Sequence, residues 1–66
     1  MNTDEYNQRV DEVIQDFRKI SKSDYEVIWL LSDFMHRNYE NGEDDIAIIY
    51  HEAITKVCKE HINKGE

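Results

Sequence analysis

The stretch that decides the fold covers residues 23–45 and reads SDYEVIWLLSDFMHRNYENGEDD. It begins with a capping box, because Ser23 stands three residues before Glu26 and an apolar run follows. It ends with Asn41-Gly42 and a run of acids, and this dipeptide commonly ends a helix and forms a turn. Between these two signals the apolar residues recur with helical spacing. The stretch therefore predicts one helix over residues 24–39, then a turn and a new helix.

Two further amphipathic segments flank this central helix. One covers residues 3–20, with Thr3 as the expected N-cap, and the other covers residues 43–63. Both connections are short, so consecutive helices should run antiparallel. The sequence predicts an all-α protein, a small up-down-up three-helix bundle formed by the single domain 1–66. The alternative is a helical hairpin that completes its core by dimerising.

The helical spacing also predicts which residues share the core and which charges pair along a helix. The expected core residues are Tyr6, Val10, Val13, Ile14, Phe17, Ile20, Val27, Ile28, Leu31, Phe34, Met35, Ile46, Ile49, Tyr50, Ala53, Ile54 and Val57. The expected acid–base pairs at i,i+4 are Glu5–Arg9, Asp33–Arg37, Glu52–Lys56 and Glu60–Lys64.

The composition excludes several classes of protein. Fifteen acids against eight bases give a net charge of −7, which disfavours binding to nucleic acid and to anionic lipid. The single Cys58 cannot form an internal disulfide, which is typical of a reducing compartment. Residues 1–5 lack the features of a signal peptide, and the apolar run 27–31 is far too short to span a membrane. A cytoplasmic protein that binds neither nucleic acid nor membrane is expected.

The central helix carries an aromatic strip away from its core residues, formed by Tyr25, Trp29 and His36. Tryptophan and tyrosine are common anchors of protein interfaces, so the strip is a candidate partner-binding face. The alternative is that one of the other helices covers this flank.

Acids gather near the turn between the second and third helices. This acidic end consists of Glu40, Glu43, Asp44 and Asp45. Acids at helix N-termini are ordinary capping electrostatics, which accounts for the last three. Capping does not account for Glu40, at the C-terminal end of its helix, nor for the overall excess of acids. Either solubility or attraction to a basic partner would account for that excess.

Two isoleucines of the third helix, Ile48 and Ile62, fall on its polar side. They are a candidate homodimer contact, and the alternative is that each is a singly exposed apolar residue.

No pattern of residues predicts catalysis, a metal site or a cofactor. Cys58 and His61 stand at i,i+3, but a structural zinc ion needs four ligands and His51 lies too far along the helix to join them. There is no phosphate-binding loop, and the acids fall at expected helix ends, where burial does not raise a pKa for acid catalysis.

The favoured function is therefore a small acidic protein-binding regulator or inhibitor that acts on a basic partner protein. Its size and charge are typical of antitoxins, immunity proteins and phage modulators, and a nucleic-acid mimic is the extreme case. The alternative is a structural self-association module, a homodimer with no separate ligand. A helix-turn-helix DNA-binding protein has the right number of helices, but its third helix would present acids to phosphates.

Overall fold

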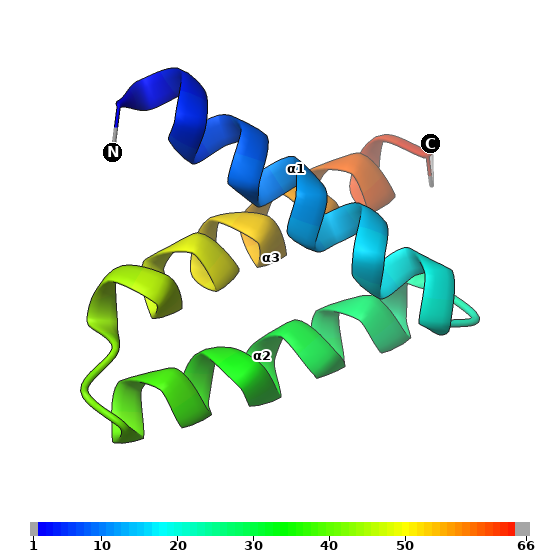
Figure 1. Ribbon diagram of the computed structural model, residues 1–66. Helices are drawn as coiled ribbons and strands as arrows, with labels where there is room; N and C mark the ends of the chain where they lie inside the picture. Colours follow the sequence, from blue (N-terminus) through cyan, green and yellow to red (C-terminus); the bar gives the residue numbers. More distant parts are fainter. Residues whose placement is uncertain (1, 65–66) are drawn as a thin grey trace.

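The computed structural model of the protein consists of three helices, and it describes residues 2–64 and the side chains of 2–63. Helix α1 covers Thr3–Ile20, α2 covers Asp24–Glu40 and α3 covers Asp44–Lys64. They run up, down and up, and no strand occurs in the described range (Figure 1). The predicted all-α three-helix bundle is confirmed.

The helix ends follow local sequence signals, with one correction. Ser23 is the N-cap of α2, and its hydroxyl accepts a hydrogen bond from the Glu26 backbone N–H at 3.2 Å, as the capping box predicts. Gly42 adopts φ +78°, a conformation that few other residues adopt without strain, and α2 ends just before it. The expected cap at Thr3 is wrong, because Asn2 caps α1 with its side-chain oxygen 2.8 Å from the Glu5 nitrogen.

The core lies where the three helices meet. Every helix contributes buried aliphatic side chains: the cluster consists of Val10, Ile14, Val27, Leu31, Ile49, Ala53 and Val57. Six further predicted core residues are partly buried and pack against it: Tyr6, Val13, Phe17, Ile28, Tyr50 and Ile54. The helical period therefore identified the inward faces correctly for most positions.

Three predicted core residues lie instead at the surface: Ile20, Phe34 and Ile46 are exposed. Ile20 is the last residue of α1, and Ile46 belongs to the first turn of α3. Both therefore sit at helix ends, where a neighbouring helix covers less of the side chain. Ala47, which was not assigned to the core, is fully buried.

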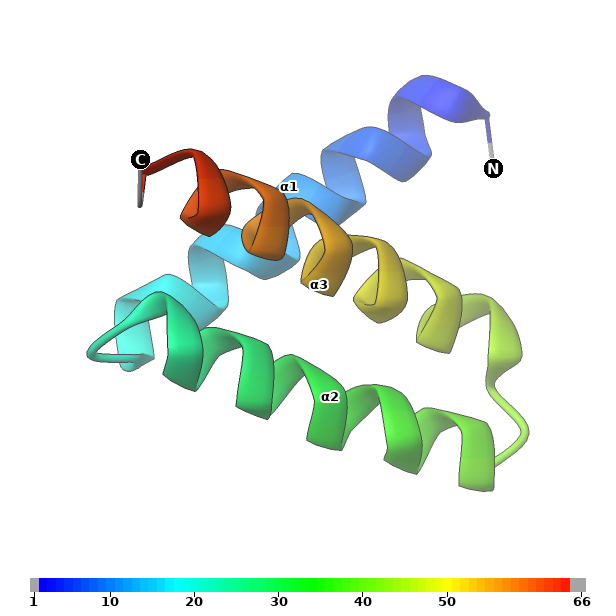
Figure 2. The ribbon, with the colours of Figure 1, turned by 180° about the vertical axis from the view of Figure 1, so that it is seen from behind.

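The helices do not pack equally. Helices α2 and α3 form an antiparallel hairpin, and α1 crosses α3 at an angle, so its N-terminal half points away from α2 (Figures 1 and 2). An aromatic cluster joins all three helices, with ring centroids of Phe17 and Phe34 5.3 Å apart and those of Phe34 and Tyr50 6.1 Å apart. The C-terminal part of α1 therefore contacts both helices of the hairpin.

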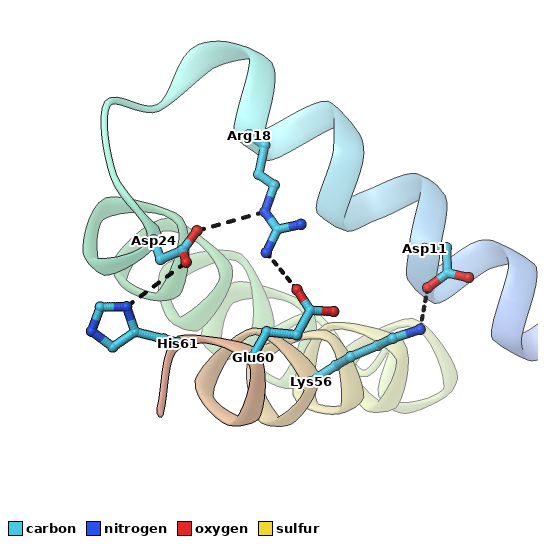
Figure 3. A network of polar contacts seen from close by, with 6 residues as sticks. All are labelled: Asp11, Arg18, Asp24, Lys56, Glu60 and His61. Atoms are coloured by element: carbon cyan, nitrogen blue, oxygen red, sulfur yellow. Dashed lines mark hydrogen bonds and ion pairs between the residues drawn. The ribbon is translucent and has the colours of Figure 1, made fainter. Parts of the chain in front are cut away.

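Hydrogen bonds and ion pairs connect α1 to the hairpin formed by α2 and α3 (Figure 3). Arg18 of α1 donates a hydrogen bond to Glu60 of α3 at 2.7 Å, and its Nε lies 3.6 Å from a carboxylate oxygen of Asp24. Lys56 of α3 donates to Asp11 of α1. The hydrogen bond to Glu60 raises the pKa of Arg18, and the one to Asp11 raises the pKa of Lys56.

Of the three predicted i,i+4 pairs whose side chains the structure describes, one has the expected geometry, Arg37 with Asp33 at 3.2 Å. Arg9 lies near Glu12 at 4.0 Å, while Lys56 and Glu60 reach across to α1. The side chain of Lys64 lies outside the described residues. For Lys56 and Glu60, contacts between helices thus replace the predicted contacts within α3.

Candidate functional site

The aromatic strip lies on the outer face of α2. At 100° per residue, Trp29 lies about 160° around the helix axis from the buried residues Val27 and Leu31. Its side chain is accordingly 63% exposed, and that of Tyr25 is 81% exposed. Neither α1 nor α3 covers this flank. The structure therefore leaves the strip accessible, and its role in binding stays a prediction.

Alongside this strip runs a row of acids. Glu26, Asp33 and Glu40 are spaced seven residues apart, which places them on one flank of α2 at intervals of about 10 Å. Arg37 pairs with Asp33. The sequence analysis did not predict this acidic row. The seven-residue spacing of its three acids would have indicated it.

His36 connects the strip with the acidic end. Its Nε2 atom lies 3.1 Å from a carboxylate oxygen of Glu40, one helical turn further along. Both side chains are more than 60% exposed, so solvent screens this contact. A shallow surface depression lies beside the pair, between Trp29 and His36; it is lined by Trp29, Ser32, Asp33, Met35 and His36.

The acidic end itself is fully open to solvent. Glu43, Asp44 and Asp45 are exposed, and within residues 2–63 none of the three forms an ion pair. The first turn of α1 lies on the same side of the molecule but apart from the α2–α3 turn (Figures 1 and 2). The acids of α1 therefore do not merge with this end into one patch.

The two candidate dimer residues of α3 are both exposed, but they lie far apart. Ile48 is 49% exposed and Ile62 is 62% exposed. Fourteen residues of helix separate them by about 21 Å, and His51 and Thr55 lie between them. The Tyr6 hydroxyl donates to the Ile48 carbonyl oxygen at 3.4 Å, and burial raises the pKa of that tyrosine. The two isoleucines do not form a continuous apolar patch.

Cys58 and His61, which stand at i,i+3 on α3, do not form part of a metal site in the described structure. His61 Nδ1 lies 3.8 Å from Asp24, and Cys58 is half-buried. Within the described side chains, no group of three or more His, Cys, Asp or Glu residues is placed to hold a metal ion.

A groove that sequence reasoning missed lies between α1 and the N-terminal half of α3. Val13, Ile49 and Tyr50 supply its apolar lining, with Ile46 exposed at its edge. Arg9 and Asp45 stand on its rim. The four apolar residues had all been assigned to the core, so periodicity alone could not reveal that α1 leaves this side open.

Comparisons with protein families, curated proteins and solved structures find no match to this chain. Along the described part of the chain, every helix is too short or too polar to cross a bilayer.

Proposed function

We propose that the protein is a small acidic binding module, a regulator or inhibitor of a basic partner protein, and that the outer face of α2 contacts that partner. The observation that carries the proposal is Trp29, a large apolar side chain that is 63% exposed opposite the core. Leaving an indole in water forgoes the free energy of burying it, which a binding partner would recover.

The charges around Trp29 indicate the chemistry of the partner. The row Glu26, Asp33 and Glu40 flanks the aromatic strip, and within α2 only Arg37 and His36 oppose it. Lysine and arginine side chains can pair with these carboxylates and also stack on the faces of Trp29 and Tyr25. A partner helix or strand that carries bases around an apolar centre would complement this face.

The net charge of −7 supports the same proposal through the kinetics of association. A strongly acidic molecule attracts a basic partner over several ångströms and thereby raises the association rate, whereas short-range contacts set the dissociation rate. The acidic end formed by Glu40, Glu43, Asp44 and Asp45 would contribute to this attraction, and Trp29 would provide the anchor.

The test uses the immobilised protein to capture partners from cell extract, followed by binding kinetics with each purified candidate. Trp29→Ala should raise the dissociation rate at least about tenfold, as expected for an anchor residue. The matched control is Ile62→Ala, which alters an equally exposed apolar residue on α3 and should leave the rate unchanged.

A second variant separates steering from anchoring. Neutralising Glu43, Asp44 and Asp45 together to Gln and Asn should slow association and flatten its dependence on salt, with the dissociation rate preserved. A captured partner that is acidic, or one whose kinetics neither variant changes, would contradict the proposal.

A further inference from the structure

The groove between α1 and α3 is an opening in the core. Its lining residues Val13, Ile49 and Tyr50 continue directly into the central packing, and Tyr50 stacks on the exposed Phe34 of α2. In a closed three-helix bundle the first helix would cover these groups. Here the N-terminal half of α1 points away from α2 (Figure 1), and Ile46 beside the groove is 40% exposed.

The rim charges indicate what covers the groove. Arg9 stands on the α1 side and Asp45 on the α3 side. Both signs of charge are therefore present, unlike on the acidic end. A twofold interface brings one patch against itself, so it must be complementary to itself in charge.

The rim residues are also available for contacts with another chain. Within residues 2–63 Arg9 forms one ion pair, with Glu12 at 4.0 Å, and both side chains are more than half exposed, so that pair is weak. Asp45 forms no ion pair within residues 2–63. Two acidic copies repel each other least where each presents bases as well as acids.

We propose that this groove is covered by a second copy of the chain, as a twofold homodimer in which Arg9 of each copy faces Asp45 of the other. Ile46, which is 40% exposed beside the groove, then becomes buried in the contact. The groove is lined by α1 and α3, whereas Trp29 lies on the outer face of α2, so the dimer leaves the aromatic strip free. The dimer shares Asp45 with the acidic end, but binding through Trp29 can be tested separately from dimerisation.

The test is the mass in solution, by light scattering and sedimentation equilibrium from micromolar to millimolar concentration. The wild type should reach twice 8.0 kDa. Ile46→Glu should raise the dimer dissociation constant at least about tenfold. The matched control is Ile48→Glu on the same helix, with 49% exposure against 40% for Ile46, and it should leave the dimer intact. Circular dichroism melting checks that each variant folds.

A charge swap makes the test specific for the proposed contact. Arg9→Asp and Asp45→Arg should each weaken the dimer, and the double variant should restore it, which a merely structural effect would not do. A wild type that stays at 8.0 kDa at every concentration overturns the proposal. So does a dimer that Ile48→Glu breaks and Ile46→Glu does not. If Ile46→Glu and Ile48→Glu both dissociate the dimer, the charge swap decides between the two outcomes. In that case a double variant of Arg9→Asp and Asp45→Arg that stays monomeric overturns the proposal.

Discussion

At the scale of single residues, the protein depends on side chains that satisfy backbone groups at helix ends. Asn2 and Ser23 each accept a hydrogen bond from a backbone N–H that has no partner within its helix. Ser32 makes a different bond, because its hydroxyl donates to the Ile28 carbonyl oxygen at 2.8 Å, which already has a partner in the helix. Serine is therefore important at position 23 and replaceable at position 32.

Ser23→Ala should lower the free energy of unfolding by about 1 kcal/mol, because the first turn of α2 loses its cap. Ser32→Ala is the matched control and should cost nothing measurable, since alanine favours the helix interior. Urea denaturation followed by circular dichroism measures both. Equal losses in the two variants would contradict this account of the capping box.

Trp29 is the only tryptophan, so fluorescence reports on the proposed binding face alone. At low ionic strength we expect cesium ions to quench its emission more strongly than iodide, because Asp33 lies close by and the whole molecule is acidic. Stern–Volmer constants measure this, with neutral acrylamide as the control for access. Stronger quenching by iodide would contradict an acidic environment of Trp29.

At the scale of helices, charged pairs hold α1 on a hairpin that is more extensively packed. Lys56 with Asp11, and Arg18 with Glu60, connect α1 to α3 near the middle and the C-terminal end of α1 (Figure 3). No such pair is described at the N-terminal half, where the groove opens. There Val10 and Tyr6 pack on the core, and the Tyr6 hydroxyl donates to the Ile48 carbonyl oxygen of α3.

The hydrogen bond to Asp11 raises the pKa of Lys56, so Asp11→Asn should lower that pKa toward the ordinary value for lysine. The matched control Asp16→Asn changes the same residue type elsewhere on α1. It should leave the pKa of Lys56 unchanged. An NMR titration of the lysine side chain measures the shift. An unchanged pKa of Lys56 in Asp11→Asn would show that α1 is not fastened at this point.

The sign of this linkage sets the pH range of the effect on stability. Because the folded chain holds the Lys56 proton more tightly, the contribution is complete below the ordinary lysine pKa of 10.5. It is lost as the pH rises through the raised value. Tyr6, whose pKa burial raises from 10.0, acts in the same direction. Alkaline solution should therefore loosen α1.

At the scale of the whole molecule, repulsion among acids opposes the compact state. The net charge is −7 on 66 residues, and the ion pairs between helices involve few of the acids. Such pairs at exposed positions contribute little. Screening should therefore remove more repulsion than attraction.

We expect sodium chloride at physiological concentration to raise the melting temperature by a few degrees relative to low salt, equivalent to about 0.5–1 kcal/mol. Thermal melting by circular dichroism at constant pH and protein concentration measures it. Choline chloride is the control that separates screening from specific sodium binding. A melting temperature that falls with salt would show that ion pairs outweigh the repulsion.

The sequence by itself determined the features that depend on neighbours along the chain. The capping box at Ser23, the turn at Asn41-Gly42 and the inward faces of the helices were all predicted correctly. Each follows from interactions within about four residues, whose geometry a helix repeats without reference to the rest of the molecule. The same logic placed Trp29 away from the core, although only the structure shows that no other helix covers it.

The tertiary structure alone decided how α1 lies on the hairpin. The crossing angle opens the groove and brings Lys56 to Asp11, in place of its predicted partner Glu52. An angle between helices results from many side chains packing at once, each contributing little, so no short pattern encodes it. The sequence therefore determined the three helices, and the packing of the folded chain decided which of their surfaces remain for partners.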